Sequence, residues 1–214
     1  MAAMKNFVLL ACCVALLAAG CTVAEPAEPR PAAARVTAAW QAGQHTVWEL
    51  YWPAAPVGGP VTVESWQADG RYRYEILETA APGLLGETLA FDGRTAYRYN
   101  RLNPPAEFTP SEPHMSPVSD AFARISAQLA QPAIAATGQP AQLNGRPVWH
   151  INLTFAGGAT LAAWLDESTG LLAQIEVAGG NGDLMRLHAR TAAPLPDPAP
   201  ELFTVGPWAG NHQE

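Results

Sequence analysis

The sequence predicts a mainly β fold of the α+β class, in which antiparallel strands surround one helix. Apolar and polar residues alternate along most of the chain, as they do in half-buried strands. Asp-Gly, Asn-Gly and Gly-Gly pairs separate the alternating segments, as tight hairpins require. One segment has a helical apolar stripe with signals for both a start and a stop. The 214 residues are enough for one domain with a sizeable core.

The first residues have the order of a bacterial export signal. A positive charge at Lys5 is followed by an apolar run from Phe7 to Ala19 and then by Gly20 and Cys21. The run is shorter than the about 20 residues that a membrane-spanning helix needs. The small residues in front of Cys21 resemble a lipobox, where bacteria attach diacylglycerol to the cysteine and cleave before it. We therefore expect a lipoprotein signal peptide over residues 1–20 and covalent diacylglycerol and palmitate on Cys21.

Two alternatives to this interpretation are open. The segment is also compatible with an ordinary secretory signal whose cysteine is incidental. Cys12 is a second possible acylation site, but the apolar run before it is shorter than the about 7 to 15 residues expected. Once the signal is removed, Cys21 is the one remaining cysteine, so the mature chain has no thiol pair for a disulfide or a redox site. Acylation best explains a lone cysteine at a new N-terminus.

The charge of the chain limits its partners. The formal net charge is −7, and beyond Lys5 all cations are arginines without a basic run. Binding to nucleic acid or to anionic lipid head groups is therefore not expected. The acyl chains would anchor the protein, at about 0.8 kcal/mol per buried methylene. We expect a monomeric, extracytoplasmic lipoprotein on the cell surface or the periplasmic face of a membrane.

A tether is expected between the signal and the domain. Residues 21–35 are rich in proline and alanine, a composition typical of extended polyproline geometry. At about 3.1 Å per residue, such a tether holds the domain roughly 40 Å from the membrane. The segment from Ala39 to His45 has little helical stripe, so we expect no helix before the first strand. The domain then covers residues 36–214.

The first half of the domain reads as strands joined by tight turns. Alternation predicts strands at His45–Trp52, Val61–Trp66, Arg71–Leu77, Glu87–Phe91 and Arg94–Arg101. The turns Asp69-Gly70 and Asp92-Gly93 tolerate positive φ and separate the members of two hairpins. In one strand Tyr72 and Tyr74 face one side and Arg73 and Glu75 the other, as in a half-buried sheet. Thr95, Tyr97 and Tyr99 also share a face.

A helix and a second group of strands follow. Ser116 is a suitable N-cap, Pro117 suits the first helical position, and Pro132 stops the helix. The apolar stripe consists of Val118, Phe122, Ile125 and Leu129, which predicts packing on the sheet; binding of a partner is the alternative. After the turn at Asn144-Gly145, strands are expected at 146–155, 159–166, 171–177 and 183–191.

The sequence lacks the local motifs of several enzyme classes. It contains no H-E-x-x-H, C-x-x-C, G-x-S-x-G, G-x-x-x-x-G-K or G-x-G-x-x-G pattern. The run from Gly179 to Gly182 reads as a hairpin turn because no helix follows it. His150 and His188 fall in strands and read as partly exposed sheet residues. We therefore expect neither an enzyme nor a metal or catalytic cofactor.

Several segments, taken in order, resemble the LolA/LolB-like superfamily of bacterial lipoprotein carriers, which includes RseB-type sensor domains and mycobacterial lipid-binding lipoproteins. Residues 71–75 (RYRYE) are similar to its R-x-R-Y/F-E strand, and residues 91–99 (FDGRTAYRY) to its D-G-K/R-x-x-W/Y-x-Y hairpin. Gly145-Arg146, the segments WLD and TGL at 164–171, and ELFT at 201–204 resemble its later strands and closing segment. Each motif alone is weak, and their order carries the resemblance over most of residues 61–205.

The resemblance implies a curved, unclosed antiparallel half-barrel with a helical plug or lid on its concave face, over an apolar cavity. Apolar walls would hold acyl chains, since covering hydrocarbon gains about 25 cal/mol per Å². The residues expected in the wall are Tyr97, Tyr99, Phe122, Ile125, Leu129 and Trp164. A filled core without space for a ligand is the alternative. The adjacent Leu84 and Leu85, between glycines, are expected to form a protruding apolar loop unless they tuck under the sheet.

Two functions follow from these expectations. The first is a membrane-anchored module that binds or transfers lipids or acylated molecules. The second is an envelope sensor or accessory lipoprotein that uses the same scaffold for protein contacts.

Overall fold

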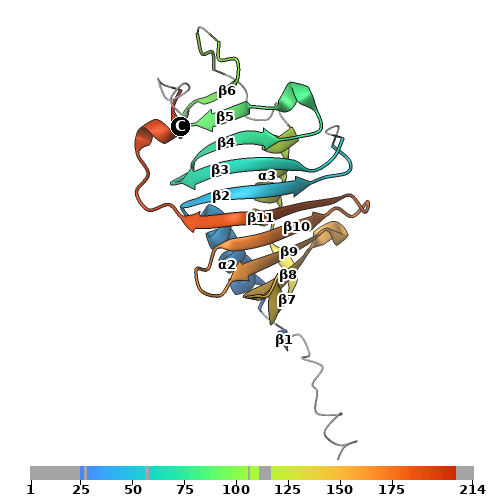
Figure 1. Cartoon of the computed structure of the whole chain (residues 1–214). Coiled ribbons are helices and arrows are strands. Elements are labelled where there is room, and N and C mark those ends of the chain that lie inside the picture. Colours follow the sequence, from blue (N-terminus) through green and yellow to red (C-terminus); the bar gives the residue numbers. More distant parts are fainter. Residues whose placement is uncertain (1–24, 27, 56–57, 106, 111–116, 206–214) are drawn as a thin grey trace, which may run out of the picture.

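A computed structural model of the chain describes residues 25–26, 28–55, 58–105, 107–110 and 117–205. The predicted signal peptide and Cys21 lie outside these residues. The strands form one antiparallel sheet in the order β1-β7-β8-β9-β10-β11-β2-β3-β4-β5-β6 (Figure 1). The strands are β1 (Glu25–Pro26), β2 (Gln44–Tyr51), β3 (Val61–Ala68), β4 (Arg71–Glu78), β5 (Glu87–Phe91), β6 (Ala96–Asn100), β7 (Ala133–Leu143), β8 (Arg146–Phe155), β9 (Thr160–Asp166), β10 (Leu172–Ala178) and β11 (Leu184–Pro194). β1 and β6 are the two edges, so the sheet is not closed.

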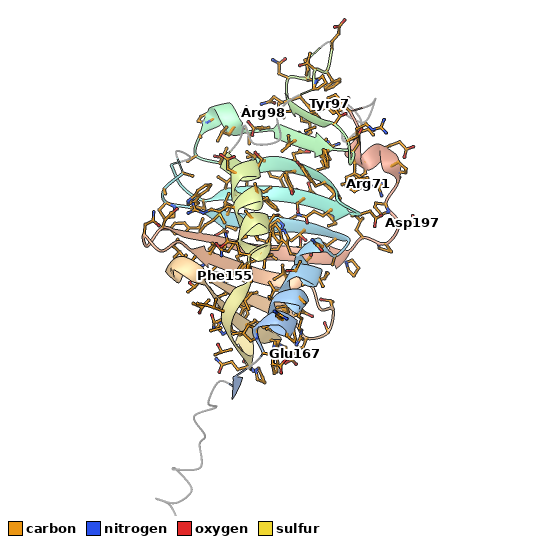
Figure 2. All side chains as sticks on the ribbon, turned by 180° about the vertical axis from the view of Figure 1, so that it is seen from behind. Arg71, Tyr97, Arg98, Phe155, Glu167 and Asp197 are labelled. Atoms are coloured by element: carbon orange, nitrogen blue, oxygen red, sulfur yellow. The ribbon has the colours of Figure 1, made fainter. Side chains whose placement is uncertain are left out.

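Two helices, α2 (Pro29–Gln41) and α3 (Pro117–Leu129), lie on the same side of this sheet. Figure 2 shows both in front of the strands, with α3 toward the β2–β5 half and α2 toward the β7–β10 half. We call the side that they cover the concave face and the other side the convex face. The predicted mainly β architecture, an unclosed antiparallel sheet with helices on one face, is confirmed.

Local turn chemistry accounts for the hairpins. Asp69 and Gly70, and likewise Asn144 and Gly145, all have positive φ, between 51° and 78°. These residue types adopt that region at low cost and match the twist of the flanking strands. The turns therefore occur where the sequence predicts them, and the strand boundaries differ from the predicted ones by a few residues.

The core lies between the concave face and the two helices. Alternate residues of β2, from Gln44 to Leu50, are buried on this face, while the residues between them are partly exposed. Trp149, Ile151, Leu153 and Phe155 of β8 share the concave face. The largest fully buried side chains include Trp48, Leu50, Ile76, Ile125, Ile151, Leu153, Phe155, Leu161, Leu165, Leu172 and Ile175. The indole nitrogen of Trp48 donates to Ser65 Oγ at 2.9 Å, which satisfies its one polar group.

The expectation of no helix before the first strand is wrong. α2 begins with two prolines in its first turn, where their missing N–H groups cost nothing. Its buried residues Ala32, Val36, Ala39 and Trp40 recur at helical spacing and pack on the sheet. Alanine, which dominates the segment, is also the best helix former.

The segment from 21 to 35 is therefore not an extended tether over its whole length. Glu25 and Pro26 pair with β7, opposite Gly138 and Thr137. The helix begins at Pro29 and contacts β7 and β8. The same prolines that favour extended chain also fit the first turn of a helix, and packing against the sheet decides between the two.

A strand absent from the predictions, β7, pairs with β8 over its whole length. It contains Gly138 and Pro140, both unfavourable in strand interiors. On its other side it has only the two-residue β1 as a partner, so it is close to an edge, where proline is tolerated. Gly138 faces Trp149, whose indole nitrogen would lie 3.0 Å from an added Cβ.

The convex face of β4 is covered, which the alternating pattern did not predict. The short helix η3 (Pro200–Phe203) packs on β4, and Phe203 is fully buried. The guanidinium of Arg71 lies over the Phe203 ring, 4.8 Å from its centroid. Arg73 and Glu75, expected on a solvated face, are therefore only 2% and 5% exposed.

An ion pair attaches α3 to the turn between β10 and β11. Arg124 Nη1 lies 2.7 Å from Asp183 Oδ2, and Trp52 Nε1 donates to Oδ1 of the same carboxylate at 3.3 Å. In the described part of the chain, no helix has the length and apolar character needed to cross a membrane.

Candidate functional site

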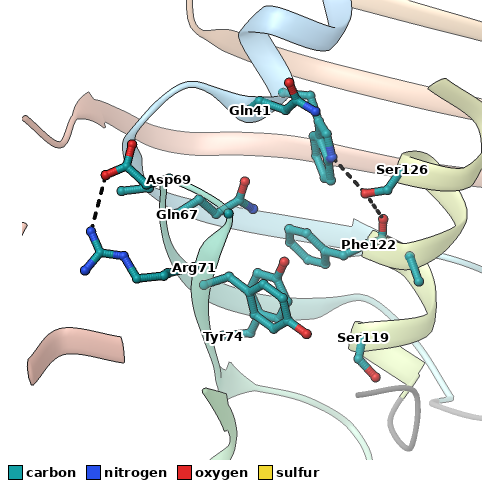
Figure 3. A pocket seen from close by; sticks show the side chains of 13 residues that line it. Gln41, Gln67, Asp69, Arg71, Tyr74, Ser119, Phe122 and Ser126 are labelled. Atoms are coloured by element: carbon teal, nitrogen blue, oxygen red, sulfur yellow. Dashed lines mark hydrogen bonds and ion pairs between the residues drawn. The ribbon is translucent and has the colours of Figure 1, made fainter. Parts of the chain in front are cut away.

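A pocket of about 630 Å³ opens between the two helices and the β3–β4 hairpin (Figure 3). We call it the helix–hairpin pocket. Its walls come from the last turn of α2, from the two arms and turn of the hairpin, and from one side of α3. The lining residues are Trp40, Gln41, Gln67, Ala68, Asp69, Gly70, Arg71, Tyr72, Tyr74, Ser119, Phe122, Ala123 and Ser126. Its volume is in the range typical of small-molecule sites.

A continuous row of aromatic rings forms one side of this pocket. Centroid distances are 5.4 Å from Trp40 to Phe122, 4.1 Å from Phe122 to Tyr74, and 4.8 Å from Tyr74 to Tyr72. Phe91 extends the row at 5.1 Å from Tyr72. Trp40, Phe122 and Tyr74 are buried, while Tyr72 and Phe91 are partly exposed. The row therefore leads from the core to the pocket opening.

The two tyrosines in the row stay protonated at neutral pH. Burial raises the pKa of the Tyr74 phenol well above its ordinary value, and the neighbouring Tyr72 raises it further. Burial also raises the pKa of the Tyr72 phenol. Both hydroxyls thus add hydrogen-bonding capacity to the pocket without adding charge.

Next to the row lie two buried side-chain amides with polar atoms that have no hydrogen-bond partner among the described residues. Gln44 and Gln67 are register neighbours on β2 and β3, and both face the concave side. Gln44 is fully buried and Gln67 is 9% exposed. The side-chain Oε1 and Nε2 of Gln44 and the Nε2 of Gln67 lack a hydrogen-bond partner in the described residues. Since an unpaired buried polar group costs about 1–3 kcal/mol, a polar ligand group at Gln67 would offset such a cost.

A hydrogen bond joins the two helices at this site. Trp40 Nε1 of α2 donates to Ser126 Oγ of α3 at 3.0 Å, and Ser126 Oγ donates to the Phe122 carbonyl at 3.0 Å. At the opening, Arg71 Nη2 lies 3.3 Å from Asp69 Oδ2, which pairs the two charged side chains that line the pocket (Figure 3). The arrangement suits an amphipathic ligand, with apolar contact along the rings and polar contact at the amides.

The structure places the six residues expected in the cavity wall in three different settings. Phe122 lines the helix–hairpin pocket. Ile125 and Leu129 continue the same stripe of α3 but lie in the closed core, 0% and 8% exposed. For these two residues the alternative of a filled core describes the packing.

Tyr97, Tyr99 and Trp164 lie on the convex face and do not line a cavity under the helices, which corrects their expected position. Tyr97 and Tyr99 pair with Ala90 and Thr88, whose side chains point away from the concave face. Trp164 alternates with the core residues Ala163 and Leu165, and its ring stacks on His150 at 4.4 Å.

The loop with the two leucines is compact. Pro82–Leu84 forms the short helix η1, and Leu84 is half-buried against the core. Leu85 is 39% exposed. Leu84 thus packs against the core and Leu85 faces outward. Insertion of this loop into a membrane stays a prediction.

Residues that sequence reasoning did not connect with the site are Trp40, Gln67 and the tyrosines of β4. The shared face of Tyr72 and Tyr74 was visible in the alternation of β4. Trp40 completes a stripe with Ala32 and Val36, and this stripe was the signal for α2. Among the described residues, no group of three or more His, Cys, Asp or Glu side chains is placed to hold a metal ion.

No protein-family model matches the sequence, and no curated protein matches it. Several solved structures are similar to this chain. MucB in complex with MucA(peri) has a TM-score of 0.50 and 16% identity, over 84% of this chain and 60% of that chain. The Mycobacterium tuberculosis lipoprotein LppX has a TM-score of 0.47 and 9% identity, over 80% and 98%. A LolA superfamily protein from Nitrosomonas europaea has a TM-score of 0.40 and 9% identity, over 83% and 98%.

At these identities the similarity concerns the fold, and it rests on MucB, an RseB-type protein. This chain spans about 60% of the length of the MucB chain. The unclosed antiparallel sheet, the two helices on its concave face and the similarity to MucB agree with the ordered motifs of the sequence. The chain has the fold of the LolA/LolB-like superfamily.

Proposed function

We propose that this chain is a membrane-anchored, extracytoplasmic lipoprotein whose helix–hairpin pocket binds the acyl chain of a lipid or an acylated molecule. One observation carries the proposal: a row of aromatic rings leads from the core to the opening of a pocket of about 630 Å³, beside the buried amide nitrogen of Gln67, which has no hydrogen-bond partner among the described residues. The rings would contact the acyl chain. The amide would donate to an ester or amide oxygen of the ligand.

The proposed contact predicts how affinity depends on chain length. Each methylene that enters the pocket gains about 0.8 kcal/mol, which is roughly a fourfold gain in affinity. Affinity should therefore rise by about this factor per methylene until the pocket is full, and then level off. A ligand held by its head group alone would show no such dependence.

Filling the pocket tests the proposal. Ala123 lines the pocket on α3, and Ala127, one turn later on the same helix, is exposed and does not line it. We expect Ala123→Trp to abolish binding of a lysophospholipid series, measured by isothermal titration calorimetry, and Ala127→Trp to leave it unchanged. The proposal is wrong if the wild-type protein binds no member of the series, or if Ala123→Trp binds as tightly as the wild type.

The anchor has a separate test. Intact-mass spectrometry of protein from a bacterial membrane fraction should show the mass of an acylated N-terminal cysteine. The Cys21→Ser variant should be missing this mass and should leave the membrane fraction. A wild-type protein that is cleaved at another position, or that carries no acyl group, would contradict the anchor without affecting the pocket.

A protein partner is the second candidate function, since the structure of MucB with MucA(peri) pairs this fold with another protein. In this case the protein would act as an envelope sensor or an accessory lipoprotein through contacts with another protein. Pull-down of an envelope protein that persists with Ala123→Trp would favour this function over lipid binding.

A further inference from the structure

A second pocket, of about 310 Å³, lies on the convex face, across the sheet from the helix–hairpin pocket. We call it the convex pocket. Strands β3 and β4 form its floor, and Arg101, which follows β6, and Leu202 of η3 form its rim. Its lining residues are Glu64, Trp66, Arg73, Glu75, Leu77, Arg101 and Leu202.

The central feature of this pocket is a buried guanidinium that is only partly paired. The Arg73 side chain is 3% exposed, and its Nη2 lies 3.6 Å from Glu75 Oε2. Its Nε and Nη1 have no hydrogen-bond partner among the described residues. Arginine stays protonated in proteins, so burial without acceptors for these two nitrogens is costly. An oxygen-bearing ligand would supply the missing acceptors.

The charges around Arg73 favour an anion as that ligand. Glu75 also forms an ion pair with Arg101, so one carboxylate serves two guanidiniums. The second carboxylate of the pocket, Glu64, is held by His45 Nε2 at 2.7 Å. The two arginines thus share one carboxylate, and two N–H groups of Arg73 have no acceptor among the described residues and are left for the oxygens of a ligand.

The remaining walls favour a ligand with an apolar part. Trp66, Leu77 and Leu202 line the same pocket, and the Arg73 guanidinium lies 5.7 Å from the centroid of the Trp66 ring. The volume is at the lower end of the range for small-molecule sites, too small for a lipid with two acyl chains.

We propose that the convex pocket binds a small carboxylate that bears a short apolar group. Arg73 and Arg101 bind the carboxylate, and Trp66, Leu77 and Leu202 contact the apolar group. A free aliphatic acid and the C-terminal residue of a peptide share this chemistry. The site is separate from the helix–hairpin pocket, and the proposal does not depend on the function of that pocket.

The test compares hexanoate with hexanamide, which has the same chain without the charge. Each is titrated into the full-length protein up to about 10 mM, where even a millimolar complex is largely saturated. We expect binding of hexanoate and at least tenfold weaker binding of hexanamide. Equal affinity for both, binding of neither, or tighter binding of inorganic phosphate would overturn the proposal.

Variants locate the site. Arg73→Met replaces a buried, incompletely paired charge by an apolar chain of similar length, and Glu75 keeps its ion pair with Arg101, so no buried carboxylate is left unpaired and the variant should fold. We expect it to weaken hexanoate binding at least tenfold. Arg190→Met removes an exposed arginine of β11 as the matched control and should change the affinity less than twofold. Unchanged binding by Arg73→Met would refute the assignment.

Two further arms identify the source of the carboxylate and the independence of the site. A short peptide with a free C-terminus that binds more tightly than hexanoate, and loses binding on amidation, would assign the pocket to peptide ends; the reverse order would assign it to free acids. Ala123→Trp should leave hexanoate binding intact, so that failure of either pocket is seen separately.

Discussion

Replacing Ile125 by alanine tests whether α3 is an integral part of the core. Ile125 is fully buried on the inner side of α3, within the cluster between helix and sheet. The change removes three carbon groups, worth about 2.4 kcal/mol at about 0.8 kcal/mol each. With the energy of the cavity that remains, the total is about 3–4 kcal/mol, within the about 2–5 kcal/mol seen for such substitutions.

Ile134 of β7 provides the matched control because it is 64% exposed. Ile134→Ala removes the same atoms from water rather than from the core, so we expect a loss below about 1 kcal/mol. Urea unfolding followed by tryptophan fluorescence measures both values. In thermal unfolding, Ile125→Ala should lower Tm by roughly 10 °C, at about 2–4 °C per kcal/mol for a domain of this size.

The outcome decides between an integral helix and a helix that acts as a loosely held lid. A loss below about 1 kcal/mol for Ile125→Ala, equal to that of the control, would show that α3 contributes little to the folded core. The filled packing described for this part of the concave face would then be wrong.

Three further predictions concern polar contacts. Ser65→Ala leaves the buried indole N–H of Trp48 unpaired and should lower the free energy of unfolding, measured in urea, by about 1–3 kcal/mol. An unchanged free energy of unfolding would contradict this. Asp183→Asn removes the ion pair with Arg124 and should cost about 1 kcal/mol, a difference that must shrink in 1 M salt if it is electrostatic. Burial lowers the pKa of the His150 imidazole, so the folded state takes up a proton less readily than the unfolded state. The wild type should therefore lose stability as the pH falls below about 6.5, and His150→Gln should lose less; equal pH profiles of Tm would contradict this.

The hairpins and α3 are predictable because their signals are local. The pair Asn144-Gly145 needs only its own backbone preferences to form a tight turn, and the stripe of α3 begins at a proline and ends before another. α2 and β7 depend on tertiary packing instead. Pro29 is compatible with extended chain as well as with a first helical turn, and Gly138 is poor in a strand until Trp149 packs against it.

The site was only partly predictable because alternation shows which residues share a face and does not show which face is concave. Tyr97 and Tyr99 were correctly assigned to one face, but the register places that face away from the helices. The convex face near β4 is also apolar in part, since the closing segment with Phe203 covers it. Gln67 has the polarity of a solvent-facing residue, and only the structure places it beneath a helix.

The early start of the folded domain has a consequence for its position at the membrane. If Cys21 carries the proposed anchor, only three residues separate it from Glu25, where the chain first joins the sheet. A segment of this length reaches about 14 Å at full extension, compared with the roughly 40 Å of the tether expected from the sequence. The folded domain would then lie close to the lipid surface, with β1 and the adjacent β7 nearest to it, and a bound lipid would move only a short distance between bilayer and protein.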